Sequence, residues 1–223
     1  MKILTGAVLA ASLGLAGAAN AATYIVTVWT GAPNGTDSST TADLAGKPGG
    51  LASAMFTYTG PIDWVNEEAQ NSDSTGNLFS NFFNTYSADI TGFSSPRGTY
   101  ANEAAFLADS MSNAGDSYDT YMQITGNAAT AVTGTITHDD GASVYDLNSN
   151  AVYSSPAETS SVTGNFSLPA GDFTVDYVEA NGSPSILEFA TSVPEPATWA
   201  MLLAGFAFVG YAMRRRRTSV SFA

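Results

Sequence analysis

The feature that most constrains the fold is a series of short segments, rich in β-branched and aromatic residues, that recur at regular spacing after Gly115. A regular series of short alternating segments separated by turns is typical of an all-β sandwich or barrel. The predicted strands cover residues 118–124, 132–138, 143–147, 152–154, 162–168, 173–178 and 186–190. Residues common in turns separate them, at 125–127, 139–141, 148–150, 169–172 and 181–184. This part of the chain therefore predicts an antiparallel β-sandwich.

The segment before Gly115 is less regular. Residues 24–29 and 55–58 are dominated by β-branched and aromatic side chains and predict two further strands. Large apolar residues then recur at spacings of one, three and four, which is typical of a helix of about two turns; they are Leu78, Phe79, Phe82, Phe83 and Tyr86. A second short helix is predicted within residues 104–111, with Phe106, Leu107 and Met111 facing inward. The predicted fold class is therefore mainly β, with short N-terminal helices.

The N-terminus has the pattern of a secretory signal peptide. Lys2 is followed by a short apolar stretch rich in Ala, Leu and Gly, which ends at Ala19, Asn20 and Ala21. Small residues at this spacing are typical of a signal peptidase site, and cleavage is expected after Ala21. The alternative is an N-terminal membrane anchor, but the apolar stretch is short. The first 21 residues are therefore expected to be absent from the mature protein.

The C-terminus combines an extended tripeptide, an apolar segment and a basic cluster. Pro194, Glu195 and Pro196 precede the 17 uncharged residues 197–213, which as a helix cover about 25 Å of a hydrocarbon core of about 30 Å. Trp199 and Tyr211 lie near the two ends of this run, where aromatic side chains favour the membrane interface. The basic cluster that follows is Arg214, Arg215, Arg216 and Arg217. The pattern predicts a C-terminal transmembrane helix with the preceding residues outside the cytoplasm.

Together, the tripeptide, the helix containing Trp199 and the terminal arginines resemble the PEP-CTERM protein-sorting domain. The resemblance implies that a membrane-embedded transpeptidase, exosortase, recognises Pro-Glu-Pro, removes the helix and releases or transfers the protein to the exterior. Proteins of this class are typical of Gram-negative bacteria that make exopolysaccharide. The same tail is also classified under an ice-binding-protein C-terminal name, which does not imply that this chain binds ice. The alternative is an ordinary C-terminal anchor with a proline-rich collar.

The two ends predict four regions along the chain. They are a signal peptide at 1–21, an exported acidic β-rich domain at 22–192, the sorting signal at 193–217 and a cytoplasmic tail at 218–223. The predicted route is export, anchoring in the inner membrane through the C-terminal helix, and then placement at the cell surface or in the extracellular matrix.

The exported domain is strongly acidic and lacks cysteine. Between residues 22 and 192 only Lys47 and Arg97 are basic, against nineteen Asp and Glu, which leaves a charge of −17. Nucleic-acid backbones require Lys and Arg contacts, so nucleic acid is excluded as a partner, whereas cations are natural ones. Because there is no cysteine, the domain cannot rely on disulfides and must be stabilised by its core, with a bound metal as a further contribution.

The densest chemical signal is the stretch from Gly134 to Tyr145, which contains His138, Asp139, Asp140 and Gly141. Two adjacent carboxylates at the end of a strand offer several hard oxygens to one cation, which suits Ca²⁺ with its six to eight oxygen ligands. A plain turn uses the same residue types. The sequence leaves both interpretations open.

Four short segments resemble the second half of a PA14-type β-sandwich. They are residues 137–145, 168–171, 173–177 and 185–189, which include Asp-Asp-Gly and a Pro-Ala-Gly turn. In calcium-dependent sugar-binding members of that family, paired aspartates joined by a cis peptide hold Ca²⁺ while sugar hydroxyls complete its coordination. The resemblance implies that Asp139 and Asp140 take this role, with Asn181 as the counterpart of the family's later asparagine ligand.

The sequence gives less support to zinc binding, serine hydrolysis or ice binding. His138 is the only histidine, so a multi-histidine zinc site is excluded, and no Gly-x-Ser-x-Gly motif supports a serine hydrolase. Thr133, Thr135 and Thr137 are expected to line one exposed strand face, which is too little for an ice-binding array. The main hypothesis is a non-enzymatic, exported surface or matrix protein that associates with exopolysaccharide in a biofilm, with Ca²⁺-assisted sugar contacts. The alternatives are a purely structural matrix protein without a ligand and a secreted hydrolase.

Overall fold

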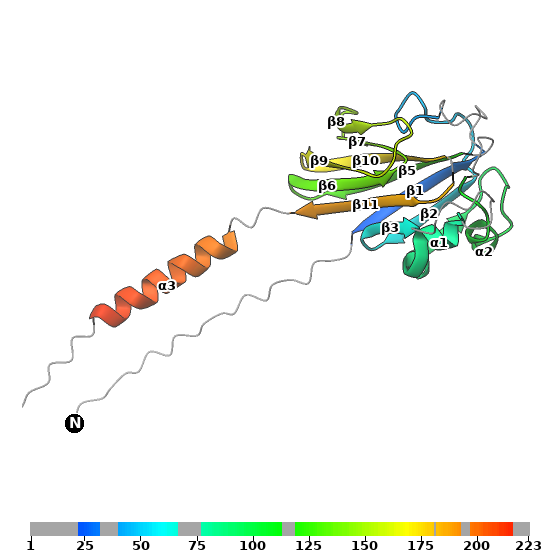
Figure 1. Ribbon diagram of the computed structural model, residues 1–223. Coiled ribbons are helices and arrows are strands. Elements are labelled where there is room, and N and C mark those ends of the chain that lie inside the picture. Colours follow the sequence, from blue (N-terminus) through cyan, green and yellow to red (C-terminus); the bar gives the residue numbers. More distant parts are fainter. Residues whose placement is uncertain are drawn as a thin grey trace, which may run out of the picture.

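Two antiparallel β-sheets face each other in the computed structural model (Figure 1), which describes residues 22–31, 40–66, 77–112, 119–180, 182–192 and 197–215. One sheet has seven strands in the order β4-β2-β1-β5-β10-β7-β8, and the other has four in the order β3-β11-β6-β9. The strands are β1 (Thr23–Thr30), β2 (Ala54–Thr59), β3 (Ile62–Asn66), β4 (Ile90–Ser94), β5 (Thr120–Ala128), β6 (Val132–Asp139), β7 (Gly141–Tyr145), β8 (Ala151–Ser155), β9 (Val162–Leu168), β10 (Gly171–Glu179) and β11 (Ser185–Ser192). The predicted mainly β fold, an antiparallel sandwich, is confirmed.

Alternation along the strands separates core from surface. In β6, Val132, Ile136 and His138 are buried, whereas Thr133 and Thr135 are exposed. This matches the expectation for a strand with one face in the core and one in water. Inward aromatic side chains from both sheets meet, and Phe189 of β11 stacks on Phe166 of β9 and on Phe173 of β10, with ring centroids 4.5 and 5.5 Å apart. The sandwich is therefore held by side chains that interdigitate between the sheets.

Two strands and one apparent turn differ from the sequence prediction. Strands β3 and β4 were not predicted, because each is only five residues long and lies at a sheet edge. The turn predicted at 125–127 is wrong, since these residues lie inside β5. A Cβ on Gly126 would lie 2.6 Å from the Phe173 ring and 2.9 Å from the Tyr24 ring. The absence of a side chain at Gly126 therefore leaves room for these two rings to pack against the strand, and the glycine is not part of a turn.

The predicted N-terminal helices are present but shorter than expected. They are α1 (Phe79–Phe83), continued by the 3-10 helix η2 (Asn84–Asp89), and α2 (Glu103–Leu107). Asn84 has a positive φ of 44°, which ends α1 after one turn and a half. Phe82 and Phe83 pack on Trp64 of β3, with centroid distances of 5.7 and 4.9 Å. These helices therefore act as an aromatic cover at one end of the core.

The chain changes sheets three times at the same end of the sandwich. Asp140 connects β6 to β7, residues 156–161 connect β8 to β9, and residues 180–184 connect β10 to β11. The strand registers bring these crossovers together, because Gly141 pairs with Val178 and Asp139 pairs with Ile186. This arrangement positions the candidate site described below.

A C-terminal helix, α3 (Ala197–Arg215), follows the sandwich (Figure 1). Its large apolar side chains whose exposure is described, among them Leu203, Phe206 and Phe208, face solvent. The predicted helix is present. Among the described residues, no helix is both long enough and apolar enough to cross a membrane.

A candidate ligand cavity at the sheet crossovers

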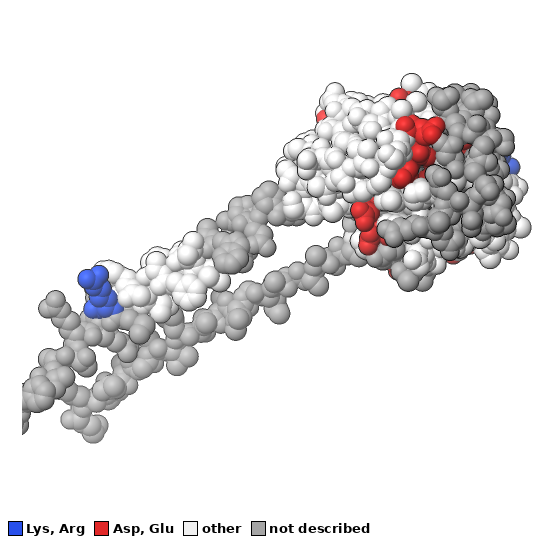
Figure 2. Space-filling view, viewed as in Figure 1, with Lys and Arg blue, Asp and Glu red and all other residues white. Residues whose placement is uncertain are grey.

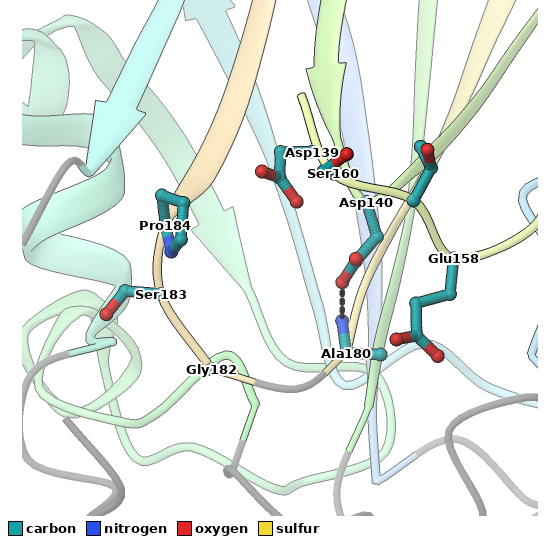
Figure 3. Close-up of a pocket in the computed structure, with 9 residues that line it drawn as sticks. Asp139, Asp140, Glu158, Ser160, Ala180, Gly182, Ser183 and Pro184 are labelled. Atoms are coloured by element: carbon teal, nitrogen blue, oxygen red, sulfur yellow. Dashed lines mark hydrogen bonds between the residues drawn. The ribbon is translucent and has the colours of Figure 1, made fainter. Parts of the chain in front are cut away.

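The three crossovers enclose a cavity of about 380 Å³. Each crossover contributes part of the wall, and Figure 3 shows their side chains around the opening. The lining residues are Asp139, Asp140, Glu158, Thr159, Ser160, Ala180, Gly182, Ser183 and Pro184. The cavity thus brings together three segments that are separate in the sequence, and its polar lining side chains, those of Asp139, Asp140, Glu158, Thr159, Ser160 and Ser183, carry oxygen atoms.

The Asp139–Asp140 pair lies where β6 leaves one sheet and β7 enters the other. The peptide bond between the two residues is cis. Both side chains are almost buried, with 8% and 5% of their surface exposed. Oδ2 of Asp140 accepts a hydrogen bond of 2.8 Å from the backbone N–H of Ala180, which Figure 3 marks with a dashed line. The chain thus places two adjacent carboxylates in the cavity wall and orients one of them.

Burial disfavours the charged form of both carboxylates. Burial first, and then the charges of Asp139 and Glu158, together raise the pKa of Asp140 to about 8, against the Ala180 hydrogen bond that lowers it. Burial also raises the pKa of Asp139, with an additional contribution from Glu158. A cation in the cavity would reverse this balance, because it favours the ionised carboxylates.

The basic side chains of the β-rich body contact other groups. The Nζ atom of Lys47 donates to Oε1 of Gln123 at 2.7 Å and lies 5.2 Å from the centre of the Trp29 ring. Arg97 donates to the carbonyl oxygen of Thr30. On the face seen in Figure 2, acidic side chains gather on the sandwich, and the prominent basic group lies at the end of the C-terminal helix.

His138 is fully buried directly beside the aspartates. Its Nδ1 contacts the carbonyl oxygen of Asp140, and its Nε2 lies 2.6 Å from the Tyr153 hydroxyl. Burial lowers the pKa of His138, so the ring is neutral at physiological pH; Nδ1–H donates to the carbonyl and Nε2 accepts from Tyr153. Both ring nitrogens are therefore occupied, and this geometry does not fit a general base for the secreted-hydrolase alternative.

A buried polar network lies behind the pair. The hydroxyl of Tyr177 lies 2.6 Å from the carbonyl oxygen of Asp139 and 2.8 Å from Oε2 of Glu179. Asn77 and Ser112 donate to Oε1 of Glu179 at 3.0 and 3.1 Å. Burial, together with the charge of Asp140, raises the pKa of Glu179 well above its usual range. A protonated Glu179 satisfies this network, because the single proton of the Tyr177 hydroxyl is then free for the Asp139 carbonyl.

The network residues were missed by the sequence analysis. Asn77 and Ser112 are separated from Glu179 by 102 and 67 positions, so no local pattern connects them. The local signal is that Asp176 and Glu179 lie next to the apolar residues Val175, Tyr177 and Val178 at the end of β10; both carboxylates are fully buried. A buried carboxylate requires polar partners, and this points to a network without identifying its members.

The remaining predicted site residues lie in α3 or outside the described ranges. Asn181, the predicted third metal ligand, lies outside the described residues, although its neighbours Ala180 and Gly182 line the cavity. Trp199, Arg214 and Arg215 lie in α3. The signal-peptidase residues Ala19 and Ala21 and the sorting residues Pro194, Glu195, Pro196, Arg216 and Arg217 also lie outside the described ranges. Within those ranges, no group of three or more His, Cys, Asp or Glu side chains is placed to hold a metal ion.

Residues 192–217 match the family model of the PEP-CTERM protein-sorting motif. The C-terminal segment is a PEP-CTERM sorting motif. This motif implies an exported protein that is processed by exosortase in a membrane-associated sorting step. The predicted identity of the tail is thus confirmed, and the PEP-CTERM motif occupies the helix α3 and the residues that flank it.

Comparison with solved structures finds distant neighbours. The "PA14 sugar-binding domain from RTX adhesin" has a TM-score of 0.49 and 16% identity, covering 79% of this chain and 93% of that one. The "PA14 domain of MpAFP Antifreeze protein" has a TM-score of 0.46 and 15% identity, covering 78% and 84%. The GH31 alpha-xylosidase from Xanthomonas citri has a TM-score of 0.31 and 13% identity, covering 78% and 18%. No curated protein sequence matches the chain. Two of these neighbours are PA14 domains.

Proposed function

We propose that this protein is an exported, PEP-CTERM-sorted component of the cell surface or extracellular matrix. Its crossover cavity binds Ca²⁺, and the ion in turn binds hydroxyl groups of an extracellular carbohydrate such as exopolysaccharide. The protein is not an enzyme in this proposal. The observation that carries it is the pair of adjacent, nearly buried carboxylates, Asp139 and Asp140, in the wall of an open cavity.

The donor atoms around the cavity fit a hard cation. Asp139 and Asp140 supply carboxylate oxygens, and Thr159, Ser160 and Ser183 add hydroxyl and carbonyl oxygens nearby. Oxygen donors favour Ca²⁺ or Mg²⁺ over Zn²⁺, and Ca²⁺ tolerates irregular shells that water or sugar hydroxyls complete. The two carboxylates would hold the ion and balance its charge. Asn181 stays a predicted ligand.

Calcium is expected to stabilise the full-length chain, and carbohydrate binding is expected to require it. At free Ca²⁺ of 100 times its Kd, binding contributes about 2.7 kcal/mol, which for a protein of this size raises the Tm by about 5–10 °C. Thermal melts in Ca²⁺ and in chelator measure this shift, and a glycan array run under both conditions measures carbohydrate binding. Calcium binding without any glycan signal would support a cation-bridging matrix protein, while equal melts would leave the ligand-free structural alternative.

Processing at both ends is expected in the native host. The mature species should lack residues 1–21 and everything after a cleavage near Pro194–Pro196, because the PEP-CTERM motif marks the chain for exosortase. Intact-mass analysis of the cell-surface fraction tests this directly. A mature species that retains Arg214 to Arg217 would instead identify α3 as a permanent anchor.

A further inference from the structure

We infer that Tyr177 and His138 are positioning residues that hold the Asp139–Asp140 pair in its cation-binding geometry. This inference rests on the proposed function, since it concerns the same cavity. Neither side chain lines the cavity. Each contacts the backbone carbonyl oxygen of one aspartate, Tyr177 that of Asp139 and His138 that of Asp140.

The need for such contacts follows from the position of the pair between two sheets. Asp139 is the last residue of β6 to pair with β11, and Gly141 is the first residue of β7 to pair with β10. Asp140 lies between them and belongs to neither ladder. A backbone segment without ladder hydrogen bonds must find other partners for its polar groups when it is buried. Here the two side chains supply those partners.

The Tyr177 contact is anchored deep in the protein. The Tyr177 hydroxyl also contacts Glu179, whose other carboxyl oxygen accepts from Asn77 and Ser112. Ser112 in turn accepts from the backbone N–H of Gly182, at 2.9 Å. One network therefore fixes both the carbonyl of Asp139 and the crossover at residues 180–184 that forms the opposite wall.

The His138 contact fixes the other half of the pair. Nδ1–H donates to the Asp140 carbonyl, and the Tyr153 hydroxyl of β8 donates to Nε2, which holds the ring in one tautomer. With both carbonyl oxygens held by interior side chains, the carboxylates are directed to the cavity wall (Figure 3). Groups that are already oriented lose less entropy on binding, so the two contacts favour ion binding without touching the ion.

The test for Tyr177 compares two tyrosines that each lose one buried hydroxyl. Tyr177→Phe removes the contact with Asp139, and Tyr58→Phe removes a hydrogen bond of 2.5 Å to the carbonyl of Pro61, away from the cavity. In chelator, the Tm of each full-length variant should fall below that of wild type by a similar amount. Outer-shell contacts are typically worth about 10–100-fold in metal affinity, so Tyr177→Phe should raise the calorimetric Kd for Ca²⁺ at least about tenfold and Tyr58→Phe less than about twofold.

The test for His138 uses a variant that keeps one donor. The side-chain amide of His138→Asn can replace Nδ1–H, whereas His138→Leu has no donor. The Leu variant should bind Ca²⁺ about tenfold more weakly than wild type, and the Asn variant should recover most of that loss. Since His138 is the only histidine, ¹⁵N NMR of its ring in the wild-type chain reads its tautomer without any calcium. The Nδ1–H form is expected, and the Nε2–H form would overturn the role of His138.

The outcomes separate this inference from the proposed function. If the wild-type chain binds Ca²⁺ and Tyr177→Phe and His138→Leu bind it equally well, the positioning roles are wrong while the proposed function stands. If the wild-type chain does not bind Ca²⁺, the proposed function fails and this inference fails with it.

Discussion

The double substitution Asp139→Asn and Asp140→Asn is expected to stabilise the cation-free protein at pH 8. It is also expected to abolish the rise in Tm that calcium causes. The folded-state pKa values of both carboxyls are raised, that of Asp140 to about 8, so the folded state binds protons that the unfolded chain has released. The contribution of this pair to stability is therefore greatest near pH 4 and below and falls as the pH rises towards 8, as the two buried carboxyls ionise. Asn keeps the shape and an acceptor for the Ala180 N–H but carries no charge.

The expected differences are large enough for simple melting experiments. In chelator at pH 8, the double variant should be more stable than wild type by about 2 kcal/mol or more, which corresponds to a Tm about 4–8 °C higher. At pH 4 the two proteins should melt together. Added Ca²⁺ should raise the Tm of wild type and leave the double variant unchanged.

A single exposed substitution provides the control. Asp172 is exposed, with a hydrogen bond to Asn127, and lies outside the cavity lining. Asp172→Asn should therefore keep both the pH dependence and the calcium response of wild type. A double variant that is less stable than wild type at every pH, in chelator, would show that the pair is a structural turn and not a charged ion site.

Replacing Gly141 with Ala is expected to damage both stability and the cavity. A Cβ at this position would lie 2.2 Å from the carbonyl oxygen and 2.8 Å from the carbonyl carbon of Pro156. Both atoms belong to the backbone, and the same carbonyl accepts a hydrogen bond of 2.8 Å from the backbone N–H of Ala42. The crossover at 156–161 therefore cannot move away from the new Cβ without disturbing this hydrogen bond. Overpacking of this kind costs about 1–3 kcal/mol, and the Tm should fall by about 2–12 °C.

The same substitution should also weaken calcium binding. The displaced crossover carries Glu158, Thr159 and Ser160, which form one wall of the cavity. A matched control is Gly49→Ala, where a Cβ would meet no atom within 4 Å. This variant should melt and bind Ca²⁺ like wild type. If Gly141→Ala lowers the Tm but binds Ca²⁺ normally, the crossover at 156–161 does not form part of the ion site.

The strands on which this cavity is built were largely predictable because their pattern is local. The alternation of buried and exposed side chains in β6 and β9 can be read residue by residue, and residues 162–168 form a strand with the predicted bounds. The short edge strands β3 and β4 were not predicted, since five residues carry too little alternation. Gly126 was misread as a turn because only the packed structure shows the rings of Tyr24 and Phe173 against it.

The sequence alone determined the sorting motif, the mainly β fold and the Asp139–Asp140 pair, because each depends on neighbouring residues. Only the tertiary structure decided what surrounds that pair. The registers of β6, β7, β10 and β11 bring three crossovers into one cavity, and contacts over as many as 102 positions connect Asn77, Tyr177 and Glu179 behind it. Such contacts are selected by the burial of the whole core, in which each buried polar group must find a partner wherever the chain supplies one.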